Sequence, residues 1–261
     1  MGIINVTPDS FYRGSRVEEE KSLIMRAEKM LQEGATILDI GGYSTRPGAE
    51  DIPAEVEKDR VVRAISSLTV AFPDAVLSVD TFRAGVARSA VEAGASIIND
   101  VSGGTLDEGM YKTVAQLAVP YVLMHMKGTP QTMKSLADYE NLLEEILSYF
   151  SRKVHMLRQM GIADIILDPG FGFAKTISHN FELLNKLRYF HIFGLPLMAG
   201  LSRKSMVYHT LGISPEEALN GTTVCHTAAL MNGADILRVH DVKEAIEVVK
   251  LVNLINQGVE K

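Results

Sequence analysis

Three polar side chains in this chain have the types and positions to hold a planar heterocycle. Asp80, Asn99 and Asp168 each stand at the end of a short apolar run. A carboxylate accepts two parallel N–H bonds, so it suits a ring that carries an amino group beside a ring N–H, as a 2-aminopyrimidinone does. We therefore predict an acceptor pocket for such an edge. The alternative is that Asp80 and Asp168 only cap the turns that follow them.

A second set of residues is cationic or suited to anions, and it comprises Asn5, Arg46, Arg203, Lys204, Arg238 and His240. The whole chain carries a formal net charge of -6, so an anion must be met by local cations and not by a general positive field. Arginine forks and a lysine point charge are common partners of phosphate. We predict a phosphate or diphosphate subsite, and the alternative is a set of surface ion pairs.

Other chemistries are excluded by patterns that the 261 residues lack. The chain has no GxxxxGK[ST] or GxGxxG nucleotide loop, and its seven histidines show no metal-ligand spacing such as HExxH. The one cysteine, Cys225, permits no internal disulfide. The acidic balance predicts no nucleic-acid partner. The lack of a signal peptide and of any run near the ~20 apolar residues that span a bilayer predicts a cytoplasmic protein without a membrane partner.

Eight short apolar runs predict the strands that must position these residues. They lie near residues 2–5, 36–40, 75–79, 96–99, 120–124, 164–168, 195–199 and 235–239. The runs are apolar on both faces, which is typical of a buried parallel sheet. Helical periods lie between them. The longest covers residues 139–160 and stops at Gly161, and Ser214-Pro215-Glu216-Glu217 has the cap, first-turn proline and early acids of a helix start.

The residues that precede the strands alternate in type along the chain. A Gly-Ala pair precedes the second, fourth and eighth strands, a looser version precedes the sixth, and Pro73, Pro120 and Pro196 introduce the third, fifth and seventh. Odd and even strands fill alternate core layers in a closed barrel. We therefore predict one α/β domain over residues 1–261, a (β/α)8 TIM barrel, with a doubly wound open sheet as the alternative.

Such a barrel would gather the polar residues at the carboxyl ends of its strands, where active sites of this fold lie. These ends carry Asn5, Asp39, Asp80, Asn99, His125, Asp168, Ser202 to Lys204 and Arg238 to His240. Since polar groups at strand ends need partners, a bound ligand can supply them.

Eight motifs, in order along nearly the whole chain, resemble those of the dihydropteroate synthase family. They are NVTPDSF at 5–11, GGYSTRPG at 41–48, SVDT at 78–81, IIND at 97–100, MHMKGTP at 124–130, DPGFGF at 168–173, LSRKS at 201–205 and RVHDV at 238–242. The resemblance implies an eight-stranded barrel, usually homodimeric. It also implies a transferase of folate biosynthesis that joins 6-hydroxymethyl-7,8-dihydropterin diphosphate to 4-aminobenzoate, releases pyrophosphate, and is inhibited by sulfonamides that compete with the aminobenzoate.

Position by position, the resemblance also implies roles for single residues. The pterin would be held by Asp80, Asn99, Asp168 and Lys204, and the diphosphate by Asn5, Arg238 and His240, with Asn5 also contacting Mg²⁺. Thr45 and Arg46 would lie on a mobile second loop, Ser202 near the aminobenzoate, and Met124, Phe173 and Val239 among the other substrate contacts. The expected catalytic residues are Asn5, Thr45, Arg46, Lys204, Arg238 and His240.

The chain departs from the family pattern at two places. The first loop usually reads SFSDGG, whereas residues 10–15 here read SFYRGS, in which Arg13 adds a cation. The chain also starts directly at the first strand, where relatives carry a short leading segment, so we expect the bottom of the barrel to be less well covered.

The resemblance implies a dissociative reaction that needs no nucleophilic side chain. Cations and Mg²⁺ would stabilise the leaving diphosphate, ring electrons would stabilise the emerging methylene cation, and the neutral arylamine would then attack. Two other functions stay open at this point. A methyltransferase domain that passes a methyl group to a corrinoid would need the acceptor pocket but not the cations, and the altered first loop is compatible with an inactive pterin-binding or regulatory barrel.

Overall fold

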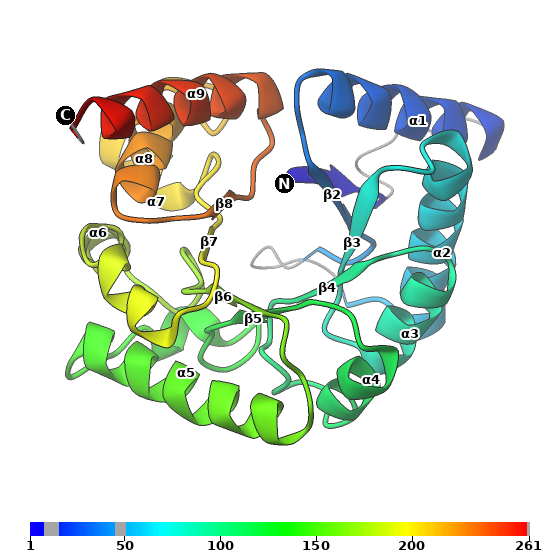
Figure 1. The fold of residues 1–261 in the computed structure, drawn as a ribbon, viewed down its shortest axis with the longest axis horizontal. Helices are drawn as coiled ribbons and strands as arrows, with labels where there is room; N and C mark the ends of the chain where they lie inside the picture. Colours follow the sequence, from blue (N-terminus) through cyan, green and yellow to red (C-terminus); the bar gives the residue numbers. More distant parts are fainter. Residues whose placement is uncertain (8–15, 45–50, 260–261) are drawn as a thin grey trace.

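Eight parallel strands alternate with helices in the computed structural model, which describes residues 1–7, 16–44 and 51–259 (Figure 1). The strands are β1 (Gly2–Asn5), β2 (Ile37–Gly41), β3 (Val76–Asp80), β4 (Ile97–Asp100), β5 (Tyr121–Met124), β6 (Ile165–Asp168), β7 (Met198–Ala199) and β8 (Ile236–Leu237). Each falls on one of the eight predicted apolar runs. The strand prediction is confirmed, with β7 and β8 shorter than their runs.

The strands close into a ring in sequence order. β1 to β6 pair as one parallel sheet, and β7 pairs with β8. Parallel bridges between Leu167 and Leu197 and between Gly2 and Val239 join the two groups, and the Ile3 N–H donates to the Val239 carbonyl at 2.9 Å. Because the last strand bonds to the first, the fold is the predicted (β/α)8 barrel and not an open sheet.

Nine α-helices are described, and they surround the strands (Figure 1). They are α1 (Arg16–Gln32), α2 (Ala54–Ala71), α3 (Ala84–Glu92), α4 (Met110–Leu117), α5 (Leu142–Gln159), α6 (Ile177–Asn185), α7 (Ser205–Leu211), α8 (Leu219–Met231) and α9 (Val242–Val259), with 3-10 helices η2 (Met133–Leu136) and η3 (Leu187–Phe193). Two helices, α7 and α8, follow β7. The last and first helices are neighbours, since a Cβ on Gly34 after α1 would meet Ile246 of α9 at 3.2 Å.

Two predicted helix boundaries differ from the structure. The helix predicted over 139–160 begins at Leu142, where the Asn141 side chain caps it. The helix start predicted at Ser214 is wrong, because α8 begins at Leu219. The carbonyls of Pro215 and Glu216 instead accept hydrogen bonds from the Arg203 guanidinium at 2.9 and 2.6 Å, so they lie in a turn outside the helix.

The core has an outer and an inner part. Helix side chains such as Val61, Ile65 and Leu68 are fully buried against the outside of the barrel. The inner part is a separate cluster that fills the barrel near the amino ends of its strands, formed by Met1, Ile97, Val122, Ile166 and Met198. Nearer the carboxyl ends of the strands, the interior becomes polar.

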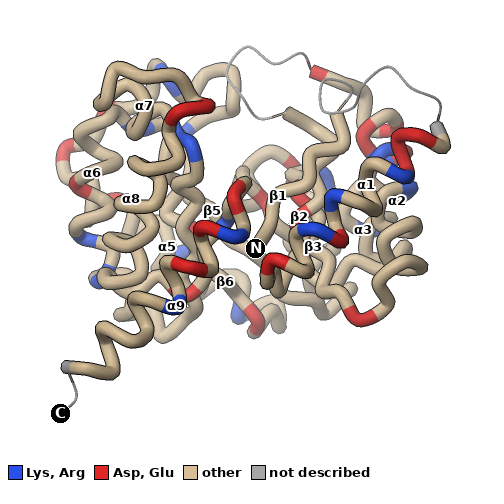
Figure 2. The backbone as a smooth tube through the Cα atoms, turned by 90° about the horizontal axis from the view of Figure 1, so that it is seen from above, with Lys and Arg blue, Asp and Glu red and all other residues tan. Residues whose placement is uncertain are grey.

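The glycines predicted to end helices do so in the left-handed backbone region. Gly34, Gly94, Gly161 and Gly233 have φ of +105°, +121°, +83° and +91°, a region that glycine enters without steric cost. Acidic and basic positions are mixed along the helices (Figure 2). Every helix within the described ranges is too short or too polar to span a lipid bilayer.

Candidate active site

Strand register brings the predicted residues together at one end of the barrel. Asn5 pairs with Gly41, Gly41 with Asp80, and Asp80 with Asn99, so these four lie on one rung across β1 to β4. Met124 and Asp168 pair in the same way across β5 and β6. Gly41 has no side chain, and a Cβ there would lie 3.5 Å from Asn5 Oδ1. The carboxyl ends of the strands therefore form one polar mouth.

Arg238 lies at the centre of this mouth and joins the two predicted subsites. Its Nε donates to Asp39 Oδ2 at 2.7 Å, and its Nη2 donates to Asp80 Oδ2 at 2.6 Å. The Asn99 amide donates to the same Asp39 oxygen at 3.0 Å. The sequence predicts separate acceptor and cation groups. The structure combines them, because side chains from β2, β3 and β4, and from Arg238 just after β8, all point into one narrow barrel.

Burial controls the titration of this network. Burial raises the pKa of Asp80 to about 7, although Arg238 opposes the shift and Asp39 adds to it. For Arg238, burial acts to lower the pKa, but Asp39 and Asp80 outweigh it and hold the pKa above its ordinary value. Asp39 is fully buried, and its Oδ1 has no partner. The guanidinium thus neutralises two carboxylates that have little access to water.

Lys204 and Asp168 form the opposite side of the mouth. The Lys204 ammonium donates to the Phe171 carbonyl and lies 4.4 Å from the centre of the Phe173 ring. Gly172, at φ +79°, permits this approach, since a Cβ there would meet Lys204 Cδ at 3.0 Å. Burial lowers the pKa of Lys204 to about 8, while Asp168 opposes the shift. Burial raises the pKa of Asp168, against the Gly170 amide and Lys204.

The other predicted substrate-binding residues do not share one position in the mouth; they are Met124, Ser202, Val239 and His240. Met124 is buried in an apolar cluster with Phe173 at the mouth. Ser202 Oγ accepts a bond from the His240 N–H at 3.2 Å, so it holds the start of the loop after β8. The predicted substrate contact of Val239 stays a prediction. Val239 is 2% exposed, its side chain packs in the outer core, and its N–H and carbonyl both bond to the β1 segment.

Arg203 does not join the predicted anion-binding group. Its guanidinium makes two bonds to Asp241, at 2.8 and 3.0 Å, and donates to the carbonyls of the turn before α8. Its φ of +52° turns the chain between β7 and α7, which separates its side chain from that of Lys204. Arg203 therefore ties two loops together through an ion pair.

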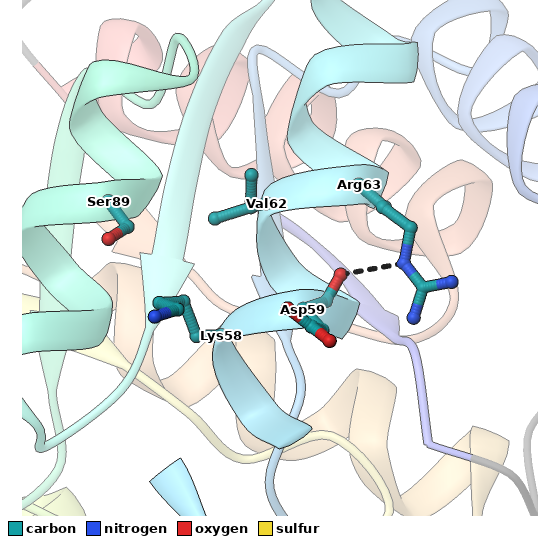
Figure 3. Close-up of a pocket in the computed structure, with 5 residues that line it drawn as sticks. All are labelled: Lys58, Asp59, Val62, Arg63 and Ser89. Carbon is teal, nitrogen blue, oxygen red and sulfur yellow. Dashed lines mark hydrogen bonds between the residues drawn. The ribbon is translucent and has the colours of Figure 1, made fainter. Parts of the chain in front are cut away.

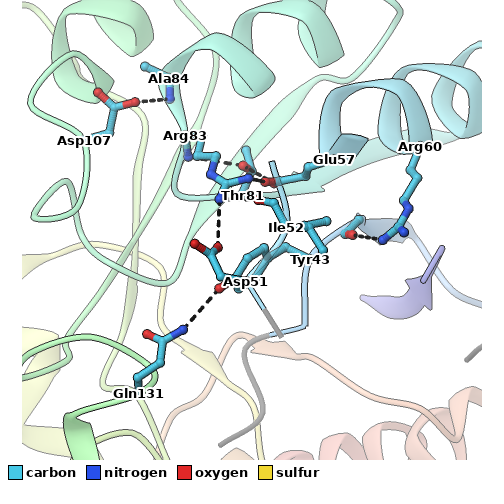
Figure 4. A network of polar contacts seen from close by, with 11 residues as sticks. Tyr43, Asp51, Ile52, Glu57, Arg60, Thr81, Arg83, Ala84, Asp107 and Gln131 are labelled. Carbon is cyan, nitrogen blue, oxygen red and sulfur yellow. Dashed lines mark hydrogen bonds and ion pairs between the residues drawn. The ribbon is translucent and has the colours of Figure 1, made fainter. Parts of the chain in front are cut away.

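Thr45 and Arg46, like Arg13, lie outside the described residues, but both flanks of 45–50 are described (Figure 4). Arg83 Nη2 donates to Asp51 Oδ1 at 3.1 Å and to the Ile52 carbonyl at 2.8 Å, and its guanidinium lies 5.2 Å from the Tyr43 ring centre. Its Nη1 donates to the fully buried Glu57 at 2.8 Å. Burial raises the pKa of Glu57, against bonds from Thr81 and Arg83.

Several of these residues had no role in the sequence-based prediction. Asp39 is among the predicted strand-end residues, but it lies inside β2. A carboxylate within a buried strand needs a cation inside the protein, and this is the signal that could have identified its role. Glu57 and Arg83 lie on helix and loop positions that look solvated in the sequence. His125 and Lys175, at 3.1 Å from each other, come from segments 50 residues apart.

The donor set fits a magnesium ion that is carried mainly by phosphate oxygens. Among the described residues, no three His, Cys, Asp or Glu side chains form a metal-binding group. Asp39 and Asp80 are engaged with Arg238, which leaves the Asn5 side-chain oxygen as a neutral ligand beside Gly41. Mg²⁺ commonly binds through one or two protein oxygens together with substrate phosphates and waters.

A groove on the outside of the barrel lacks these features. It lies between α2 and α3 and is lined by Lys58, Asp59, Val62, Arg63 and Ser89 (Figure 3). Arg63 donates to the Asp59 carbonyl at 2.9 Å, and Lys58 pairs with Glu55 on its own helix. The charged side chains of this groove are thus engaged with their own helix and do not converge on a central point, so we place the site at the mouth.

Known proteins match the chain over almost its full length. A family described as pterin binding enzyme matches residues 1–240. The dihydropteroate synthase of Escherichia coli K12 is 42% identical over 254 residues, covering 97% of this chain and 89% of that protein. The Bacillus subtilis protein of the same name is 41% identical over 261 residues, covering 99% and 89%.

Solved structures agree with these sequence matches. The Yersinia pestis dihydropteroate synthase in a sulfonamide drug complex has a TM-score of 0.92 at 41% identity, covering 98% of this chain and 93% of that one. The Xanthomonas albilineans dihydropteroate synthase with 4-aminobenzoic acid has a TM-score of 0.90 at 38% identity, covering 98% and 92%.

Proposed function

This chain belongs to the dihydropteroate synthase family of pterin binding enzymes, and on that premise we propose its function. It is a transferase of folate biosynthesis. It joins 6-hydroxymethyl-7,8-dihydropterin diphosphate to 4-aminobenzoate and gives 7,8-dihydropteroate and pyrophosphate. The observation that carries this function is the convergence of Asp80, Asn99, Asp168, Lys204 and Arg238 at one mouth.

The pterin ring would bind to the acceptors. Asp168 and Asp80 offer carboxylate oxygens to the 2-amino group and ring N–H, and the Asn99 amide adds a donor and an acceptor. Lys204, placed between Asp168 and the Phe173 ring, donates to the ring oxygen or nitrogen. For the ring to reach Asp80, Arg238 must share that carboxylate or turn outward from it.

The diphosphate would lie outside the pterin, toward the cations. Arg238, Lys204 and His240 supply charge and N–H donors, and Asn5 contributes its side-chain oxygen to a magnesium ion that the diphosphate carries. When bound, Mg²⁺ stabilises negative charge on the diphosphate oxygens. Thr45 and Arg46 are proposed to complete this subsite from the second loop.

The chemistry needs positioning more than a strong base. The bond from the methylene carbon to the diphosphate oxygen breaks, and its electron pair leaves with pyrophosphate. The aminobenzoate nitrogen then forms the new C–N bond and releases one proton to solvent or to phosphate. Lys204 and Arg238 stabilise the departing charge from fixed positions, which is the most direct way for a protein to lower such a barrier. A sulfonamide would compete for the aminobenzoate position.

The experiment that tests this function measures pyrophosphate release from the dihydropterin diphosphate with Mg²⁺, with and without 4-aminobenzoate. Release that depends on aminobenzoate, together with dihydropteroate formation, is the expected result. Tight pterin binding without release would contradict it and point to an inactive pterin-binding barrel. Pterin binding that is indifferent to the diphosphate would favour the corrinoid methyltransferase alternative.

We also propose that the protein is a cytoplasmic homodimer. The one cysteine, Cys225, is a buried free thiol, which suits a reducing compartment. Exposed apolar side chains gather on α8 and α9, namely Val224, Met231, Leu251, Leu254 and Ile255, each 51% to 64% exposed. A face of this kind is common at subunit interfaces.

A further inference from the structure

The loop between β6 and α6 carries much of the candidate site, and its backbone is unusual. Gly170, Gly172 and Ala174 all have positive φ, at +75°, +79° and +48°. Asp168 begins the loop, and its Oδ1 accepts the Gly170 N–H at 2.8 Å. Ala174 has no glycine freedom, so its conformation must be imposed by its surroundings. A side chain that holds this loop would therefore control the geometry of the pterin pocket.

The Lys175 ammonium binds this loop at three points. Its Nζ donates to the Gly170 carbonyl at 3.0 Å, to the Phe173 carbonyl at 3.1 Å and to His125 Nδ1 at 3.1 Å. An ammonium has three N–H donors, so all three are used. Two of the acceptors belong to the loop and the third lies just after β5. Lys175 thus joins the loop to the neighbouring strand.

The His125 side chain is held in place by burial and ring packing, so it is a fixed partner for Lys175. It is 3% exposed, and its ring packs edge-on against Tyr149 with 4.9 Å between ring centres. A protonated lysine has no lone pair to accept a hydrogen bond, so Nδ1 is the acceptor from the Lys175 ammonium and the ring is neutral in this contact. Burial, followed by the charges of Lys175 and Lys127, lowers the pKa of His125 to about 2. His125 is therefore a neutral acceptor for the Lys175 ammonium.

The atoms that Lys175 fixes lie directly behind those that face the substrate. The Gly170 N–H orients the Asp168 carboxylate, while the Gly170 carbonyl binds Lys175. The Phe173 carbonyl binds Lys175, while the Phe173 ring packs under the Lys204 ammonium. Gly170 and Phe173 thus each contact Lys175 through their carbonyl and a residue of the proposed pterin pocket through another group. Burial also lowers the pKa of Lys175 to about 7, with Asp168 opposing the shift. Keeping the ammonium charged in this place therefore costs desolvation free energy, which its three hydrogen bonds offset.

We propose that Lys175, supported by His125, is a positioning residue that sets the pterin-binding geometry of the loop from Asp168 to Phe173. It does not touch the substrate. This inference rests on the proposed function, because it names the pterin as the ligand whose affinity depends on Lys175. It also predicts a separation of effects. Pterin affinity depends on Lys175, whereas the affinity for 4-aminobenzoate and the turnover of bound substrate depend on it much less.

The test compares Lys175→Met with the wild-type enzyme. We expect the KM for the pterin diphosphate to rise about 10- to 100-fold, the scale on which a misplaced binding group acts, while kcat and the aminobenzoate KM stay within about threefold. Lys186→Met is the matched control. Lys186 stands just after α6 and, within the part of the chain that the structure describes, pairs with Glu182 at the surface, so its loss should leave all three constants unchanged.

Further variants test whether the effect comes from the link itself. In Lys175→Ala, added methylammonium should restore pterin affinity in part, because it can supply the missing donors. His125→Leu should reproduce the Lys175→Met effect, and the double variant should be no worse than either single one. Lys175→Gln, which keeps an N–H donor, should lie between wild type and Met. If Lys175→Met does not fold, Lys175→Gln replaces it in the comparison of the two KM values and kcat with wild type.

Two results would overturn the proposal. One is an unchanged pterin KM in a folded Lys175 variant. The other is an equal loss in both KM values and kcat, which would mean that Lys175 only supports the fold. The pterin without diphosphate is also titrated by calorimetry against each variant. If the wild-type enzyme forms no dihydropteroate, the proposed function fails, but the calorimetric comparison still decides the role of Lys175.

Discussion

Arg238 has two roles, and a single substitution would remove both at once. It is a candidate cation for the diphosphate, and it is also the guanidinium that pairs with Asp39 and Asp80 inside the barrel. Asp39 is fully buried and has one other donor, the Asn99 amide, among the described residues. Removing the cation that pairs with a buried carboxylate lowers the free energy of unfolding far more than removing the partner of an exposed one. Loss of activity in an Arg238 variant is therefore informative only if stability is measured beside it.

We predict that Arg238→Met lowers the free energy of unfolding by about 3–5 kcal/mol and lowers turnover roughly 10²- to 10³-fold. Adding Asp39→Asn should restore part of the stability, because Asp80 is then the one carboxylate of the pair left without its cation, but should restore no activity. Urea unfolding and steady-state kinetics on the same samples check both parts. An Arg238→Met protein as stable as wild type would contradict the network.

The sequence predicts which side chains reach the mouth better than it predicts their partners. Asp80, Asn99 and Asp168 could be found because a polar residue ending an apolar run is conspicuous. The pairing of Arg238 with Asp80 could not, since it depends on the width of the closed barrel. Arg203 was placed wrongly because adjacent residues usually share a region, and here a positive φ separates Arg203 from Lys204.

At the scale of elements, the junctions between helices and strands depend on glycine at particular places. Gly94 follows α3 at φ +121°, and a Cβ there would collide with the Thr69 hydroxyl. Gly85 lies inside α3, is exposed, and has open space where a Cβ would be. The two glycines, one near the start of α3 and one just after its end, therefore differ in the backbone conformation and space that they require.

We predict opposite effects for the same substitution at these two sites. Gly94→Ala should lower the free energy of unfolding by at least about 1–2 kcal/mol, the cost of a left-handed alanine, before its collision is counted. Gly85→Ala should raise that energy by up to about 1 kcal/mol, because alanine favours the helix. Denaturant unfolding of both variants, with the pterin affinity as a control for the site, checks this. Equal shifts in one direction would contradict it.

Strand positions were predictable because a buried parallel strand is apolar on both faces and short. Helix starts were less so. Ser214 to Glu217 has every local sign of a helix start, yet Arg203 withdraws the Pro215 and Glu216 carbonyls from it. A contact between segments 12 residues apart thus outweighs the local signal.

At the scale of the whole molecule, α8 lacks the apolar inner side and polar outer side of an ordinary surface helix, since its buried residues are Thr222, Cys225, His226 and Ala229. It turns Thr222 and His226 inward, at 1% and 2% exposure, and turns Val224 and Met231 outward, at 63% and 58%. A helix at a protein surface normally presents its polar side to water. Leu251, at the edge of the groove between α8 and α9, extends the apolar face onto the last helix. We expect a second copy of the chain to cover this face.

Sedimentation velocity should accordingly give twice the chain mass of 28.6 kDa for the wild-type protein. The double variant Val224→Glu/Leu254→Glu should sediment with the mass of a single chain, because a dimer would bury two charges per subunit in an apolar interface. Val70→Glu is the control, since Val70 is 85% exposed on α2, outside this face. Each barrel holds its own mouth, so the dissociated variant should still bind the pterin. A wild-type protein that sediments as one chain would rule out the dimer.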